Sequence, residues 1–526
     1  MRTVLIDAAV GLCLLCSCGS GGHKGAESGP VPSTVQVEDK DGCTVKGLVT
    51  LDGAAAPGVV VSDGVNLTRT NRDGKYWLKT GAESDFVFVS IPSGAEVATS
   101  AWEPRFWYRF HPSDEVQRFD FALRGRDNSH HKMVVITDVH ISGRTPALYS
   151  GTNIVDSLQF RRYFLPAVKA FAASCDVPCY ALNLGDMMQE IHSAKAALPE
   201  YRGVIRDFPM PLFHVIGNHD YMPDLPLADE GDEETRGFKE YYMSHMGPRY
   251  YSFNIGEVHY VVLDACKMLG GGSNKYQPHI SPAQLAWLRK DLSVVDKTKS
   301  LVIATHIAAY RSDATDSNPA TSRSLLDNRD ALMEICEGFA NIYIWSGDAH
   351  ISEVLRVNSN TVQTVHGALG GSVWWSRICT DGSPAAYTVY DFDGGRLTAT
   401  RIPYESTVDD QFALRDSNSY TPDGASKALV INVPAWELSL QGPSTWKIEV
   451  LENGVKKGEP VRFRGYDAWF VDFASNYKNP DTANKPRVTN HLFYYIPEDT
   501  AARLTVTVTD AVGRQYRKET TLKYDN

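Results

Sequence analysis

Five apolar, β-branched runs in this chain each end in a cluster of polar residues, and these runs constrain the fold more than any other feature. The runs are MVVIT, YALNL, LFHVI, LVIA and NIYIW. The polar clusters that follow them are Asp138-Val139-His140, Gly185-Asp186, Gly217-Asn218-His219-Asp220, Thr305-His306 and Ser346-Gly347-Asp348-Ala349-His350. Runs of this kind predict strands. Because loops at strand ends converge on one edge of a sheet, we expect these polar side chains to form one site.

The surrounding region, residues 130–404, alternates strand-like and helical patterns, which predicts a layered α/β domain. One helix is expected to begin at Ser281-Pro282-Ala283-Gln284, which has the form of a capping box with proline in the first turn. After Asn341 the pattern changes to successive strands with few helices. The sheet is therefore expected to gain antiparallel strands there.

The chain has 526 residues, too many for one hydrophobic core, so several domains are expected. Short strands with Gly-rich turns predict a β-sandwich over residues 41–125, after a Gly/Ser/Pro-rich linker at 19–40. Residues 405–526 again predict strands and no catalytic cluster. The aromatic run from Trp102 to Phe110 is expected to pack between domains and not to form a binding platform.

The N-terminus has the pattern of a targeting segment. Arg2 precedes a mostly apolar stretch that is shorter than the ~20 residues needed to span a bilayer. The stretch ends in Leu15-Cys16-Ser17-Cys18, which resembles a bacterial lipobox at residues 1–18 with Cys18 as the lipidated residue. Cys16 fits less well, and a disordered tail is the alternative. We expect an exported protein: a periplasmic or outer-membrane lipoprotein of a Gram-negative bacterium, with membrane contact only through the lipid anchor.

Charge and cysteine content narrow the function further. The formal net charge of -11 argues against a nucleic-acid-binding protein, which needs a basic face. A small phosphorylated substrate remains compatible with this charge, since bound metals reverse the local field. The cysteines after Cys18 show no zinc-ribbon spacing, and only Cys175 and Cys179 are close enough in sequence to suggest a local disulfide.

Taken together, the five strand-end segments resemble the motifs of the calcineurin-like metallophosphoesterase superfamily. The resemblance implies a core of two packed mixed β-sheets flanked by helices. The flanking β-sandwich and β-rich C-terminal domain resemble the three-domain arrangement of exported bacterial phosphoesterases. The resemblance also implies a centre for two divalent metals. A mixture of His, Asp and Asn ligands suits Mn, Fe or Zn better than Mg or Ca.

Carried over position by position, the resemblance assigns a role to each polar residue. The first metal would be held by Asp138, His140 and His350. Asp186 would bridge the metals, and Asn218 and His306 would bind the second. His219 would protonate the leaving alkoxide, with Asp220 orienting it, and Asn218 and His219 would also contact substrate.

The last segment departs from the family pattern. The superfamily usually has G-H-x-H, whereas this chain has Gly347-Asp348-Ala349-His350. Asp348 could ligate the second metal as an anionic oxygen, which would favour Mn or Fe. Alternatively, the second metal is weakly held. We favour the ligand interpretation, because a carboxylate at this position has a metal as its obvious partner.

Two further residues follow the last motif. His366 and Trp374 flank a Gly-Gly turn and could shape a substrate pocket. The alternative, that they form an aromatic plug between domains, is equally favoured.

The sequence therefore predicts a metal-dependent hydrolase of phosphate esters. In the mechanism that the resemblance implies, a metal-bound hydroxide attacks phosphorus; a phosphomonoesterase and a phosphodiesterase remain open. Asp348 and the flanking β domains motivate an alternative, a catalytically degenerate envelope- or carbohydrate-binding scaffold. A nucleotide-specific enzyme is a third hypothesis.

Overall fold

The computed structural model describes residues 35–113, 115–142, 154–189, 194–221, 232–269, 275–312, 325–417, 427–438, 445–476 and 485–522. The predicted targeting segment, including Cys18, lies outside these residues. No helix in the described part of the chain is both long and apolar enough to span a membrane.

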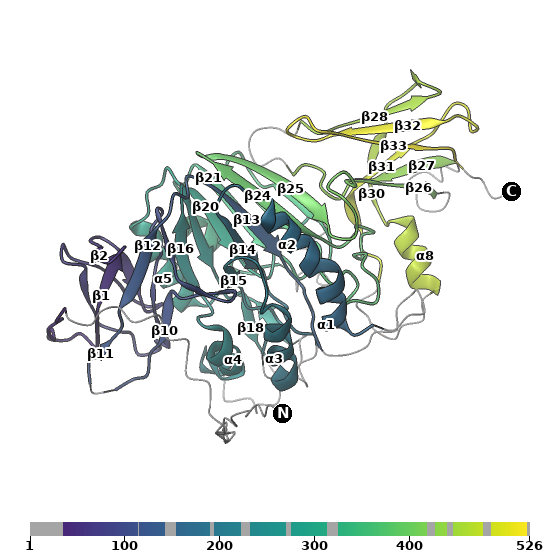
Figure 1. Cartoon of the computed structure of the whole chain (residues 1–526). Coiled ribbons are helices and arrows are strands. Elements are labelled where there is room, and N and C mark those ends of the chain that lie inside the picture. The colour runs from purple at the N-terminus through teal and green to yellow at the C-terminus, as the bar shows by residue number, and fades with distance from the viewer. Residues whose placement is uncertain are drawn as a thin grey trace, which may run out of the picture.

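The first sheet of the central domain has the strand order β15-β14-β13-β24-β25 (Figure 1). The strands are β13 (His130–Ile136), β14 (Cys179–Asn183), β15 (Leu212–His214), β24 (Ala386–Asp393) and β25 (Arg396–Pro403). The first three run parallel, whereas β24 and β25 are antiparallel additions. This sheet is therefore mixed, with β13 at its centre.

The second sheet has the order β16-β17-β20-β21-β23-β22. Its strands are β16 (Tyr251–Ile255), β17 (Val258–Val262), β20 (Ser300–Ala304), β21 (Asn341–Ser346), β22 (Glu353–Arg356) and β23 (Thr361–Val365). The four inner strands are parallel, and β16 and β22 are antiparallel edges. The antiparallel strands expected after Asn341 are present in both sheets.

Aromatic side chains join the two sheets. Phe213 stacks on Phe253 with ring centroids 4.0 Å apart, and Trp345 stacks on Tyr390 at 4.1 Å. Each pair takes one ring from either sheet, so the sheets pack face to face. The predicted core of two mixed sheets flanked by helices is confirmed.

The helices lie on the outer faces. They are α1 (Asp156–Gln159), the π-helix η1 (Phe160–Phe164), α2 (Leu165–Ala173), α3 (Ala194–Val204), α4 (Asp232–Met246), α5 (Pro282–Ser293) and α7 (Arg329–Ile335). Phe164 and Phe171 pack on Tyr387 of the first sheet. Helix α5 begins as expected, because the Ser281 hydroxyl accepts a hydrogen bond from the Gln284 backbone N–H. Its Asp291 side chain binds His259 of the second sheet at 2.9 Å.

The N-terminal β domain packs against the central domain (Figure 1). Its strands are β1 (Val45–Leu51), β2 (Ala54–Ala55), β3 (Val60–Ser62), β4 (Leu67–Arg69), β5 (Lys75–Leu78), β6 (Phe86–Val89), β7 (Ala95–Val97), β8 (Thr99–Ser100), β9 (Glu103–Pro104), β10 (Trp107–Arg109), β11 (Gln117–Arg118) and β12 (Phe121–Gly125). The aromatic run makes the expected interdomain contacts: Trp102 lies against His214, and Phe106 against Tyr251.

The C-terminal domain contains two four-stranded antiparallel sheets, ordered β26-β27-β31-β30 and β29-β28-β32-β33. The strands are β26 (Ala413–Ser417), β27 (Ala428–Asn432), β28 (Lys447–Glu452), β29 (Val455–Lys456), β30 (Val461–Gly465), β31 (Thr489–Tyr495), β32 (Leu504–Thr509) and β33 (Gln515–Thr520). One helix, α8 (Ala468–Asn476), accompanies them.

The suggested local disulfide is wrong. All six cysteines in the described ranges are free thiols, including Cys175 and Cys179. Cys179 is the first residue of β14, and its thiol lies 3.4 Å from the Val177 carbonyl oxygen.

Candidate metal centre

The five polar segments lie at the carboxyl ends of parallel strands from both sheets. Strands β13, β14 and β15 carry three of them in the first sheet, and β20 and β21 carry two in the second. Since the sheets pack face to face, these ends meet. Most of the predicted ligands then form three overlapping groups. Within each group, the ligand atoms lie within 4.8 Å of one another. The groups are Asp138, His140 and His350; His140, Asp186 and His219; and Asp138, Asp186 and His306.

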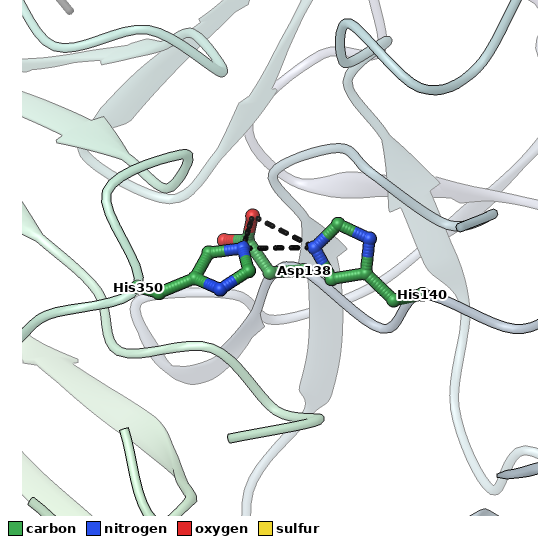
Figure 2. A group of neighbouring side chains, drawn as sticks. All are labelled: Asp138, His140 and His350. Carbon is green, nitrogen blue, oxygen red and sulfur yellow. Dashed lines mark hydrogen bonds and ion pairs between the residues drawn. The ribbon is translucent and has the colours of Figure 1, made fainter. Parts of the chain in front are cut away.

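Asp138, His140 and His350 point toward one another (Figure 2). The Asp138 Oδ1 atom is 3.2 Å from His350 Nε2 and 3.6 Å from His140 Nε2. The two Nε2 atoms are themselves 2.8 Å apart. Two imidazole lone pairs repel at this distance, so a proton or a cation must lie between them. The arrangement suits a divalent metal.

Asp186 lies between this group and a second one. Its Oδ2 atom is 3.2 Å from His306 Nε2 and 3.9 Å from both His140 Nε2 and His219 Nε2. This is the place that a bridging carboxylate would take. Asp348 also lies near His306, with its Oδ1 atom 4.0 Å from His306 Nε2. Asn218 is buried on the same loop as His219.

Hydrogen bonds behind these side chains fix their orientation. His306 Nδ1 lies 2.8 Å from the Leu184 carbonyl oxygen, and His219 Nδ1 lies 2.7 Å from that of Gln189. A carbonyl accepts only, so Nδ1 carries the proton in each ring and Nε2 faces the site. The Thr137 hydroxyl donates to Asp138 Oδ2 at 2.8 Å.

Five of the seven candidate ligands have a left-handed backbone. The φ angle is positive at Asp138 (52°), His140 (50°), Asp186 (53°), Asp348 (62°) and His350 (54°). Residues other than glycine rarely adopt this conformation, and it collects at functional sites whose surroundings enforce it. The strain is therefore a second, independent mark of the site.

The charges of the cluster are strongly coupled. Burial alone would raise the pKa of Asp138, but His350 and His140 lower it well below its usual value. Burial would lower the pKa of His306, yet the Asp186 carboxylate raises it well above its usual value. The pKa of His350 is raised in the same way, by the Asp138 carboxylate, so the carboxylates favour a positive charge on these two imidazoles. A divalent cation would supply that charge instead.

The donor set fits two divalent cations. Asp138 Oδ1 and His306 Nε2 are buried and have no hydrogen-bond partner among the described residues. Buried polar atoms of this kind are rare without a bound water or ion. Carboxylate and imidazole donors are the ligands that such metals take.

The expected pairing of His219 with Asp220 is not observed. The fully buried Asp220 carboxylate accepts hydrogen bonds from the backbone N–H groups of Met187, Met188 and Gly217. It ties together the two loops that carry Asp186 and Asn218. The Gln189 carbonyl takes the place behind His219, so Asp220 acts on the loops and not on the imidazole.

His366 and Trp374 are both buried close to the ligand loops. The two ring nitrogens of His366 lie near the Ser346 carbonyl (3.1 Å) and the Tyr390 hydroxyl (2.8 Å). The Trp374 indole N–H donates to the Val139 carbonyl at 2.6 Å. Their polar atoms are thus engaged within the protein, and a role in substrate binding stays a prediction.

One residue near the site was missed. Tyr276, on β19 (Tyr276–Pro278), donates its hydroxyl hydrogen bond to Asp348 Oδ1 at 3.2 Å. Strand β19 pairs with β18 (Cys266–Met268) in a small hairpin. A single tyrosine outside the strand-end clusters offers no sequence signal for this contact.

Fold and site together define an α/β protein with a candidate centre for divalent metals. Residues 43–126 match the model of the N-terminal domain of calcineurin-like phosphoesterases, and residues 364–516 match that of the C-terminal domain. In these two segments, on either side of most of the candidate metal centre, the chain is similar to calcineurin-like phosphoesterases, which supports a phosphoester hydrolase.

Comparison with known proteins adds distant structural likenesses. A dimetal phosphatase from Danio rerio is 14% identical, covering 52% of this chain and 95% of its own, with a TM-score of 0.37. Purple acid phosphatase from yellow lupin (Lupinus luteus) is 12% identical, covering 67% of both chains, with a TM-score of 0.38. A 5'-nucleotidase from Candida albicans is 12% identical, covering 52% and 51%, with a TM-score of 0.32. No curated protein matches the sequence.

Proposed function

We propose that this protein hydrolyses small phosphate esters at a centre for two divalent metals, Mn, Fe or Zn. The observation that supports the proposal is the position of Asp186. Its carboxylate lies between the Asp138–His140–His350 group and His306, with an imidazole on either side within 4 Å. A carboxylate shared by two ligand groups is what a pair of neighbouring metals requires.

The residues divide the chemistry among them. Asp138, His140 and His350 would hold the first metal, His306, Asn218 and Asp348 would hold the second, and both would share Asp186. Two metals held there would neutralise charge on the phosphoryl oxygens and would make water a stronger nucleophile near neutral pH. His219 turns Nε2 toward the site, because its Nδ1 is held by the Gln189 carbonyl. It is therefore placed to carry a proton to the leaving alkoxide.

Asp348 replaces the imidazole usual at its position as a ligand of the second metal. The Tyr276 hydroxyl donates a hydrogen bond to Asp348 Oδ1, the same oxygen that lies 4.0 Å from His306 Nε2. An anionic oxygen ligand there favours Mn or Fe over Zn. It also lowers the net positive charge available to the substrate.

The substrate is a small phosphorylated molecule, either a monoester or a diester. The net charge of -11 makes nucleic acid an unsuitable partner. We further propose that the protein is exported and anchored by a lipid at Cys18, as a periplasmic or outer-membrane lipoprotein. Mass spectrometry of the mature N-terminus tests the anchor.

The function is tested with Asp186→Asn. The substitution keeps the size of the side chain but removes the charge that two metals share. Hydrolysis of a chromogenic phosphodiester and a chromogenic phosphomonoester should fall by about 10²-fold or more, beyond what loss of an outer ligand contact causes. Asp73→Asn, an exposed change in the N-terminal domain, is the matched control. Wild-type rates in Asp186→Asn would overturn the proposal.

Metal content separates an enzyme from a degenerate scaffold. Elemental analysis of the purified protein, after supplementation with Mn, Fe or Zn, should find two equivalents per chain in the wild type. Asp348→Ala should retain the first equivalent and lose the second. A wild type without stoichiometric metal would support the scaffold.

A further inference from the structure

His350 is held through its backbone by one residue of a later loop. The His350 carbonyl oxygen accepts hydrogen bonds from the Thr380 backbone N–H (3.2 Å) and from the Thr380 hydroxyl (3.0 Å). His350 has a left-handed backbone with φ of 54°, a conformation that its surroundings must enforce. Thr380 supplies two of the contacts that do so.

The next residue, Asp381, holds the chain on the other side of His350. Its side chain is fully buried. Oδ2 accepts a hydrogen bond from the Ser352 backbone N–H at 2.7 Å, and Oδ1 accepts from the backbone and hydroxyl of Ser383. We call Thr380–Ser383 the clamp segment. It forms hydrogen bonds with the loop at His350 and again at Ser352.

The C-terminal domain holds the clamp segment in turn. His491 Nε2 on β31 donates to Asp381 Oδ2 at 3.1 Å, and the Asn432 side-chain amide on β27 donates to the Asp381 carbonyl at 3.1 Å. The Arg487 backbone N–H donates to the Thr380 carbonyl at 3.0 Å. His491 is 2% exposed and Asn432 is 0% exposed, so these hydrogen bonds are shielded from solvent.

The clamp segment is closely packed against the C-terminal domain. Asn432 also donates to Asp467 Oδ2 at 2.9 Å, and a Cβ added to Gly382 would lie 2.1 Å from Asp467 Cγ. Buried charges are costly unless paired, and a connected polar network in a dry interface is rigid. These contacts therefore fix the position of the C-terminal domain relative to the clamp segment.

We propose that the C-terminal domain is part of the metal centre: His491 and Asn432, acting through the clamp segment, position His350 as a ligand of the first metal. His491 and Asn432 are positioning residues, since neither touches metal or substrate. The inference rests on the proposed function and adds a role for a domain whose described residues include none of the candidate metal ligands.

The test uses the full-length protein and Mn²⁺ binding measured by titration, with kcat and KM at limiting and saturating Mn²⁺. Thr380→Val removes one hydroxyl donor to His350 at nearly constant shape, and His491→Ala removes the contact from the C-terminal domain. Each should weaken the tighter Mn²⁺ site by roughly 10- to 100-fold, the usual effect of losing a contact that orients a ligand. Saturating Mn²⁺ should restore kcat, with KM unchanged.

Two further variants separate positioning from general stability. His491→Gln can still donate to Asp381 and should recover most of the Mn²⁺ affinity. Tyr495→Phe removes a buried hydrogen bond to Glu452 (2.6 Å) within the same C-terminal domain but outside the network. It should lower the melting temperature without changing Mn²⁺ affinity.

The outcomes are distinct. If the wild type binds Mn²⁺ while Thr380→Val and His491→Ala bind it within twofold as tightly, the positioning role is overturned and the proposed function stands. If Tyr495→Phe weakens binding as much as they do, the effect is one of stability and the role is again overturned. A wild type that binds none of Mn²⁺, Fe²⁺ and Zn²⁺ overturns both proposals. Should His491→Ala fail to fold, Thr380→Val decides.

Discussion

At Gly217 the backbone approaches Asp186 so closely that no side chain fits. A Cβ built on Gly217 would lie 2.2 Å from Asp186 Oδ1 and 2.4 Å from the Asp186 backbone nitrogen. Both neighbours belong to the loop that carries the shared carboxylate. The glycine is therefore required by the site itself and not by a turn, since its φ angle is not positive.

Gly217→Ala should displace Asp186 by a large fraction of an ångström. A displacement of about 1 Å at a reacting centre can cost ~10²-fold in rate, so kcat for ester hydrolysis should fall by that order. Gly94→Ala is the matched control, because the nearest atom to its added Cβ is 3.9 Å away. Equal activity of the two variants would contradict the geometric argument.

The residues that the sequence places at strand ends are the ones that the structure brings together. Asp138, Asp186 and His306 follow buried apolar runs, and the ends of parallel strands must meet. The partners of these residues were harder to predict. Asp220 lies next to His219 in sequence, but it binds backbone N–H groups of another loop. Tyr276 reaches Asp348 only because the two sheets and a hairpin come together in space.

Among the elements, α4 is tied to the second sheet by a buried ion-pair network. Lys239 Nζ lies 2.6 Å from Asp264 Oδ2, and Arg249 Nη1 lies 2.8 Å from the same oxygen. The side chains of Lys239 and Asp264 are each 1% exposed. Burial lowers the pKa of Lys239, while the Asp264 carboxylate opposes that shift. Asp264 thus compensates two cations at once.

Asp264→Ala leaves both cations without their carboxylate. Removal of one partner from a buried pair costs about 3–5 kcal/mol, and we expect a loss of that size in the free energy of unfolding. Arg503→Ala removes a cation from Glu519 on the exposed face of the C-terminal domain and should cost no more than about 1 kcal/mol. Urea titrations of both variants against wild type measure the difference. Similar losses would contradict a special role for the buried network.

The sequence predicts the elements better than their arrangement. The capping box at Ser281 locates the start of α5, and the apolar runs locate the inner strands. Strand order is a different matter. The pairing of β13 with β24 joins Val134 to Val389, and no local pattern specifies so distant a neighbour. The division of strands between two sheets came only with the family resemblance.

For the molecule as a whole, buried neutral histidines set the response to acid. Burial lowers the pKa of His131 from 6.5 to about 4; its ring bonds the Asn128 carbonyl and the Tyr260 hydroxyl. In the unfolded chain His131 binds a proton near pH 6.5, whereas in the native state it binds one only near pH 4. The stabilising contribution is therefore complete above pH 6.5 and is lost as the pH falls from 6.5 toward 4.

His131→Gln should flatten this dependence. The drop in melting temperature between pH 7 and pH 5 should be smaller in the variant than in the wild type, even though the variant is less stable at pH 7. His111→Gln changes an exposed histidine and should keep the wild-type slope. Thermal scans at the two pH values check the prediction; parallel curves for His131→Gln and wild type would refute it.

The central position of β13 also determines when the first sheet can form during synthesis of the chain. On one side β13 pairs with β14, which follows it closely, but its other neighbour is β24, far along the chain. As the polypeptide is made, an apolar strand with an open edge must wait until β24 emerges. Contacts this distant in sequence form slowly. The growing chain therefore needs protection from aggregation until β24 has been made.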